Sequence, residues 1–296
     1  MDPAPGATLA TGLAILSSLC FGVALVTGRI GLRSIDARSG AAISIPTATL
    51  LFAVAAPFML DTSGFSLDAA AWFAVVGLFF PAVVTLLTFR SNESLGPTVT
   101  SAVSGTAPLF ALLAAGLLLG ESVPARAAIA AAGVVLGVAI ISSKRGDAHY
   151  GFSVQALIWP VSGAVIRGLA QAGAKAGLLL WPNPFAAGLI GYVVSSATVL
   201  GVNQVGRPQR PRLTRPGVVW FAVTGALNGG AVLLMYGALN AAPVSLVAPI
   251  VASYPLVTVL VSRLVLRDEP MSLRVVSGAV VTVLAIVYLV GSHATG

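Results

Sequence analysis

The stretch WFAVVG at Trp72–Gly77 returns almost unchanged, 148 positions later, as WFAVTG at Trp220–Gly225. That offset is half of the 296-residue chain. Similarity at a fixed period is typical of a duplicated structural unit. Because both copies are apolar throughout, the repeat predicts a membrane protein built from two structural halves, which we place at residues 1–147 and 148–296.

The composition places most of the chain in a membrane. Hydrophobic residues make up 57% of the sequence and charged residues 8%, with a mean hydropathy of +0.98, whereas a soluble domain carries about 25% charged residues. The net charge of +7 could indicate a nucleic-acid partner, but the basic residues are scattered between apolar runs. Basic loops between spans are their ordinary cause. We therefore expect a lipid bilayer around the chain and no nucleic acid bound to it.

Ten stretches of the sequence have the length and polarity of membrane-spanning helices, which need about 20 apolar residues. The prediction is an all-α integral membrane protein with ten transmembrane helices, five in each half, and connections too short to hold a catalytic domain. The predicted spans are 8–28, 40–60, 69–89, 95–119, 125–143, 153–178, 185–205, 217–239, 244–266 and 272–291.

Five spans in each half would turn the second half upside down relative to the first. The loop after the second span carries Asp61 and Asp68 and no basic residue, whereas its equivalent after the seventh carries four arginines within 207–215. Opposite loop charges are expected if the two loops face opposite sides of the membrane. Most lysines and arginines lie in loops on the side away from the termini, so the positive-inside rule predicts that both termini are outside.

Signals for catalysis and metal binding are missing from the sequence. His149 and His293 lie in a linker and a tail, Cys20 is the single cysteine, and no carboxylate lies in the middle of a span. Glu93 lies at the end of the third span, just beyond its last predicted residue and three residues after Arg90, and we interpret these two as a local ion pair. With no Walker loop and no nucleophile–base pair, we expect no enzyme activity, no cofactor and no metal site.

A polar stripe marks the sixth predicted span. Arg167 lies near its middle, and Gln171 and Lys175 follow one and two turns later, so all three share one helix face. An arginine at this depth costs at least ~2.5–3.5 kcal/mol to insert, so it should face a cavity or a partner. We interpret the stripe as the anion-attracting wall of a substrate cavity. The alternative is that Arg167 bonds backbone carbonyls at a helix break while Lys175 reaches the membrane surface.

Positions where the two halves differ in polarity are further candidates. Asn228 lies mid-span beside Gly229 and replaces Phe80 of the first half, while Arg167 replaces Phe21. We expect the substrate to bind where the repeat is broken in this way. The predicted substrate-binding residues are Arg167, Gln171, Lys175, Asn228, Tyr236, Ser104 and Tyr254.

Two stretches that close equivalent spans carry a family resemblance. Ala107–Leu113 runs on to Glu121, and Tyr254–Leu256 runs on to Asp268 and Glu269. These proline-bearing helices with acidic turns resemble the EamA family of the drug/metabolite transporter superfamily. The resemblance implies a pseudo-two-fold helical basket with a central cavity. Known members move amino acids, other small metabolites, nucleotide sugars or sugar phosphates.

Together, these observations predict a carrier in the bacterial inner membrane that moves an amino acid or organic anion by alternating access, with export as the expected direction. An exporter of cationic or hydrophobic drugs is the first alternative, which two positive charges in the cavity disfavour. The second is a non-transporting protein that handles lipids or assists assembly, in which the stripe would face a lateral opening or a partner. Both a monomer and a homodimer remain open.

Overall fold

The protein is helical throughout the part that the structure, a computed structural model, describes: residues 5–142, 154–204, 213–266 and most of 277–288. No strand occurs among these residues. The predicted boundary between the halves, much of the arginine-rich loop and much of the tenth predicted span lie outside them. The elements are α1 (Pro5–Leu32), α2 (Ala37–Met59), α3 (Leu67–Phe79), α4 (Ala82–Ser104), α5 (Ala107–Leu119), α6 (Ala125–Ser142), η1 (Val154–Leu157), α7 (Ile158–Leu180), α8 (Pro184–Gln204), α9 (Arg215–Ala241), α10 (Val244–Val251) and α11 (Tyr254–Leu266).

Several helical segments are long and apolar enough to cross a membrane, which confirms a multi-pass membrane protein. α5 and the first part of α6 are apolar but shorter. The exact count of ten spans, five in each half, stays a prediction. The six segments that meet the length and hydropathy of a span are Gly6–Leu32, Ala37–Met59, Leu67–Ser104, Pro184–Val202, Arg215–Ala241 and Val244–Leu266.

Three of the predicted spans are interrupted rather than continuous. The third breaks between α3 and α4, the fourth between α4 and α5, and the ninth between α10 and α11. The breaks in the fourth and ninth spans lie 147 positions apart, so they are part of the repeat. Pro108 and Pro255 follow them in the first turn of the next helix, where a missing N–H costs nothing. Helices broken at equivalent positions of two halves often mark a substrate path.

The connection between the third and fourth predicted spans also differs from expectation. The sequence analysis left residues 90–94 as a connection, but helical backbone continues through them and α4 turns later, at Gly96. Gly96 has a φ of 79°, a conformation that glycine adopts without strain. The expected loop was wrong because one glycine followed by Pro97 is enough to redirect the chain.

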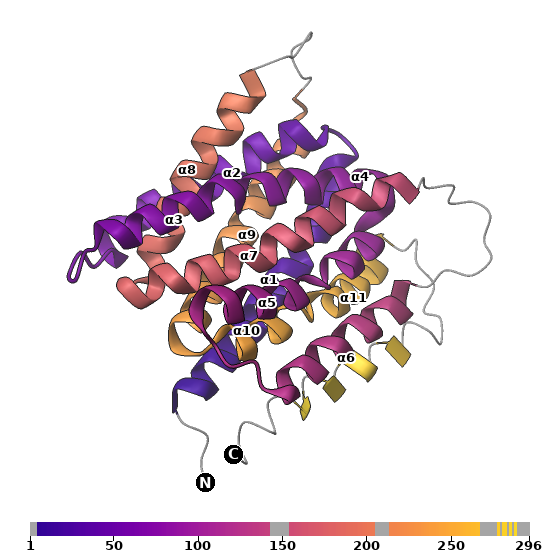
Figure 1. The fold of residues 1–296 in the computed structure, drawn as a ribbon. Coiled ribbons are helices and arrows are strands. Elements are labelled where there is room, and N and C mark those ends of the chain that lie inside the picture. Colours follow the sequence, from indigo (N-terminus) through magenta and orange to yellow (C-terminus); the bar gives the residue numbers. More distant parts are fainter. Residues whose placement is uncertain are drawn as a thin grey trace.

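The two halves interlock rather than forming separate domains. α1, from the first half, packs mainly on α9 and also on α10 and α11. α7, from the second half, packs on α3, α4 and α5, and Figure 1 shows it crossing the molecule beside them. We call these two groups the α1 bundle (α1, α9, α10, α11) and the α7 bundle (α7, α3, α4, α5). α2 and α8 pack on each other beside them.

The repeated hexapeptide preserves a helix crossing. Its last residues, Gly77 and Gly225, let α3 approach α8 and α9 approach α2. A Cβ at Gly77 would lie 2.8 Å from the carbonyl oxygen of Gly191, and a Cβ at Gly225 would collide with the backbone of Ser44. Ser44 and Gly191 are themselves 147 positions apart. The two halves therefore share this contact between helices as well as the hexapeptide.

A second pair of equivalent glycines, Gly22 and Gly168, allows a close contact between helices of opposite halves. A Cβ at Gly22 of α1 would lie 2.9 Å from the carbonyl oxygen of Tyr254, where α11 begins. A Cβ at Gly168 of α7 would lie 2.8 Å from that of Ala107, where α5 begins. Each half therefore sets its first helix against the broken helix of the opposite half, and this brings the breaks next to the middle of α1 and α7.

Candidate substrate site

Arg167 lies on the seam between the two bundles. Its side chain is only 8% exposed. The guanidinium carbon lies 5.2 Å from the ring centre of Phe21 and 5.7 Å from those of Phe80 and Tyr254. A desolvated cation over aromatic rings gains about 2 kcal/mol or more, which offsets part of the cost of its burial. Phe21 and Tyr254 belong to the α1 bundle, so the contact joins both bundles.

Two small cavities meet at this guanidinium, with volumes of about 30 Å³ and 20 Å³. A space of that size holds an ordered water but not a metabolite, so no metabolite fits beside Arg167 in this conformation. No acidic residue lines either cavity. The lining residues are Phe21, Ala24, Leu25, Phe80, Pro81, Val84, Thr85, Thr88, Phe89, Arg167, Tyr192, Asn228, Val232 and Tyr254.

Several buried polar atoms around Arg167 have no hydrogen-bond partner. They include its own Nε, the hydroxyl of Tyr192 and Oε1 of Gln171. The Tyr254 hydroxyl faces Ser104 but makes no hydrogen bond of good geometry. An unpaired buried polar group costs about 1–3 kcal/mol, and such groups are rare in folded proteins. Ordered water or a polar ligand at the seam would satisfy them.

The predicted polar stripe is a single helix face, but only its first residue reaches the cavities. Arg167 shares a cavity with Asn228 and Val232 of α9, and the other two side chains bind atoms of the same helix. Gln171 Nε2 donates to Met235 Sδ at 3.6 Å, between the helices. Lys175 Nζ donates to the carbonyl oxygens of Leu239 at 2.6 Å and Ala242 at 3.2 Å, where α9 ends.

An acidic side chain lies near Lys175, although none occurs in the same span. Glu121, which follows α5, lies close enough to interact with its charge. Glu121 Oε1 also accepts a hydrogen bond from the backbone N–H of Val244 at 3.2 Å, at the start of α10. The second positive charge of the stripe is therefore placed at a helix end and not in the cavity.

Of the remaining predicted residues, two line the cavities and two do not. Asn228 lines both cavities and Tyr254 lines one of them. Tyr236 is buried and lies close to Tyr192, while Ser104 is buried at the end of α4. Neither Tyr236 nor Ser104 lines the two cavities.

The positions where the two halves differ come together. Phe21 and Arg167 are equivalent in the repeat, as are Phe80 and Asn228, and all four line the larger of the two cavities. The two pairs of equivalent positions that differ in polarity between the halves therefore meet in one cavity. Tyr192 also lines this cavity but was not among the predicted residues, because a single hydroxyl in the middle of an apolar span is the only feature that marks it in the sequence.

Changing Asn228 tests whether the amide contributes to binding. Asn228→Leu keeps the branched shape of the side chain but removes the polar group, so substrate affinity should fall about 5–30-fold, the loss expected for 1–2 kcal/mol of hydrogen bonding. The Michaelis constant for uptake into proteoliposomes measures it. Thr106→Val is the matched control, because Thr106 already bonds the Val103 carbonyl and lies outside the cavity lining. Equal effects of both changes would contradict a role for Asn228.

Metal binding finds no support in the described part of the chain, where no group of three or more histidine, cysteine, aspartate or glutamate side chains could hold an ion. The ion pair predicted between Arg90 and Glu93 is confirmed, with an N–O distance of 3.2 Å.

Comparison with known proteins finds similarity along almost the whole chain. The model of the EamA-like transporter family matches residues 8–143 and 155–291, once in each half. No functionally curated protein matches. Chains of solved structures do match, 29 of them. One crystal structure covers 95% of each chain with a TM-score of 0.73 at 15% identity, which indicates a shared fold.

Proposed function

Because the chain belongs to the EamA-like transporter family, and so to the drug/metabolite transporters, we propose that it carries a small anionic or zwitterionic metabolite across the membrane by alternating access. Amino acids and organic acids are the substrate classes that we expect. In this role the protein moves its substrate unchanged, and we assign it no enzyme activity.

Arg167 is the observation on which the substrate class rests. A buried guanidinium that is held by aromatic rings, with a free Nε and no acid among the lining residues, attracts negative charge. Its planar donors match a carboxylate in two parallel hydrogen bonds. A cationic drug would meet an uncompensated positive charge in a low dielectric, so the cavity favours the carrier of anions over the first alternative.

The seam between the bundles supports alternating access. Both bundles supply residues to the two cavities, and each bundle does so from more than one helix. A rocking motion of one bundle against the other would open the cavity first to one side and then to the other. Because Arg167 lies in small cavities lined by residues of both bundles, this arrangement also favours a carrier over a lipid-handling protein.

Location and direction extend the same proposal. We place the protein in a bacterial inner membrane with both termini outside, since the loops on the other side carry most of the basic residues. Export is the direction that we propose. Either a monomer or a homodimer is compatible with a cavity built from one chain.

Counterflow in proteoliposomes tests the proposed function. Vesicles loaded with a single unlabelled amino acid or organic acid should take up the radiolabelled form faster than protein-free vesicles. A cationic dye should show no protein-dependent movement. Transport of the dye, with none of any anion or zwitterion in a broad panel, would contradict the substrate class.

A further inference from the structure

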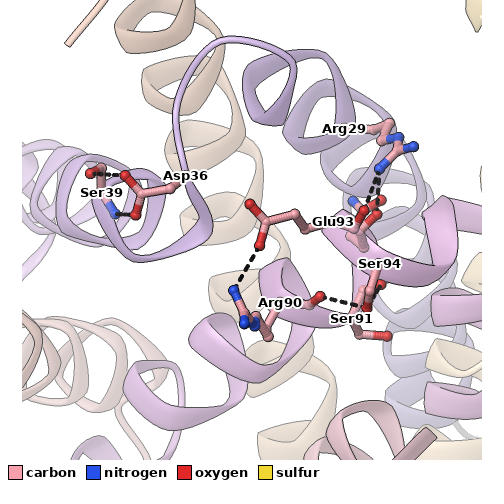
Figure 2. A network of polar contacts seen from close by, with 8 residues as sticks. Arg29, Asp36, Ser39, Arg90, Ser91, Glu93 and Ser94 are labelled. Atoms are coloured by element: carbon pink, nitrogen blue, oxygen red, sulfur yellow. Dashed lines mark hydrogen bonds and ion pairs between the residues drawn. The ribbon is translucent and has the colours of Figure 1, made fainter. Parts of the chain in front are cut away.

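Two basic side chains bind helix ends in the same way in the two halves. Arg29 Nη1, at the end of α1, donates to the carbonyl oxygens of Asn92 at 2.7 Å and Glu93 at 3.1 Å. Figure 2 shows the Arg29 guanidinium reaching the backbone of α4 at Glu93. Lys175 binds Leu239 and Ala242 in the corresponding manner.

The repeat makes these two contacts equivalent. Arg29 and Lys175 lie 146 positions apart, and so do Glu93 and Leu239. Four residues beyond each of these carbonyls the chain has a proline, Pro97 or Pro243, which has no N–H to donate. Each carbonyl is therefore left without a helical partner. A cation is the favourable partner, because the C-terminal end of a helix carries partial negative charge.

The two contacts lie at opposite ends of the molecule. α1 runs antiparallel to α9: Gly6 lies against Ala241, and Gly28, beside Arg29, lies against Thr224. From Thr224 to Leu239, where Lys175 binds, α9 extends about 22 Å at 1.5 Å per residue. Asn228, which lines both cavities, lies between these two positions.

Each contact crosses the seam between the bundles. Arg29 joins α1 to α4, and Lys175 joins α7 to α9, pairs that pack less extensively than α1 with α9 or α7 with α5. On the Arg29 side, the contact lies one turn beyond the cavity-lining residues Leu25 and Phe89. A bond that crosses the seam just outside the cavity holds that end closed.

We propose that Arg29 and Lys175 are equivalent latches that close opposite ends of the central cavity, and that release of one latch opens the cavity to that side alone. The proposal rests on the alternating access described above. Both latches are formed in this structure, and the cavities at Arg167 are too small for a metabolite. In the transport cycle one latch opens while the other holds, so the substrate never meets an open path through the membrane.

Sided labelling of a cysteine in the cavity tests the latches. In a Cys20→Ser background, Asn228→Cys supplies a single reporter that reacts with a membrane-impermeant maleimide. Arg29→Gln should raise the labelling rate about tenfold from the side of the α1–α2 connection, since charged hydrogen bonds of this strength shift an equilibrium by that much. Lys175→Gln should raise it from the opposite side. Vesicles of both orientations, without substrate, give the two rates.

Charge-conserving variants are the matched controls. Arg29→Lys and Lys175→Arg keep a donor and should stay within about twofold of the parent, since an exchanged donor still reaches the carbonyl. Where a glutamine variant does not fold, methionine keeps the aliphatic stem and removes the donors. Unchanged labelling in both variants, or a rise on the same side in both, would overturn the latches while leaving the carrier function in place. A sided shift in these variants, together with no transport of the anion panel by the protein that keeps Asn228, would refute the substrate class and keep the latches.

Discussion

Replacing Arg167 by glutamine is expected to lower kcat/KM for the uptake of anionic substrates by about 30-fold or more, the range for loss of a buried charged partner. The guanidinium is the only charged side chain among the residues that line the two cavities. Without it, a carboxylate would be buried against aromatic rings with no opposite charge, and its desolvation would be uncompensated. Initial rates in proteoliposomes, at equal amounts of folded protein, measure the change.

Arg167→Lys is the control that separates charge from geometry. Lysine keeps the positive charge but loses the planar fork, so transport should be weakened less than in the glutamine variant. Thr106→Val removes a hydroxyl that bonds the Val103 carbonyl outside the cavity lining, and it should leave substrate preference unchanged. An Arg167→Gln protein that transports every accepted anion within threefold of the parent rate would contradict the assignment of the site.

Adding one methyl group at Gly225 is expected to lower the midpoint of thermal unfolding by roughly 2–10 °C, because overpacking costs about 1–3 kcal/mol. The Cβ would collide with the backbone of Ser44, which cannot turn away as a side chain could. Gly77→Ala should have a comparable effect through Gly191. The unfolding midpoint of detergent-purified protein, followed by circular dichroism, measures both.

Gly230→Ala is the matched control on the same helix. A Cβ there meets nothing within 4 Å, and alanine is favoured over glycine within a helix by about 1 kcal/mol. The control should therefore raise the midpoint or leave it unchanged. If Gly225→Ala behaved like Gly230→Ala, the helix crossing that the repeat preserves would not determine stability.

Much of the fold could be predicted because its signals are local or periodic. Apolar length predicts the helices, and the offset between Gly77 and Gly225 predicts that one arrangement is used twice. The breaks between α4 and α5 and between α10 and α11 could not be located, since hydropathy measures polarity and not backbone direction. Pro108 and Pro255 lie next to these breaks, but proline at the first turn of a helix and proline within a helix look the same in a sequence.

The site was partly predictable for a related reason. Arg167 could be found because a charge in an apolar span is expensive, and Asn228 because the first half has a phenylalanine there. The role of Lys175 could not be predicted, since its partners, Leu239 and Glu121, are distant in the sequence. Spacing placed it on the same face as Arg167, but a helix face is long enough to pass from the cavity to the end of a neighbouring helix.

Isothermal titration of the purified parent protein and of Arg167→Gln tests the central claim most directly, because binding is measured apart from direction, orientation and coupling. The titrants are the amino acids and organic acids that show counterflow, each with the amide or ester that removes the negative charge of its carboxylate. We expect saturable binding of the parent substrates by the parent protein, weak binding of the amides and esters, and an affinity about 30-fold or more lower in the variant. Equal affinity of both proteins for the same anion would contradict the claim that Arg167 recognises the substrate at the seam between the bundles.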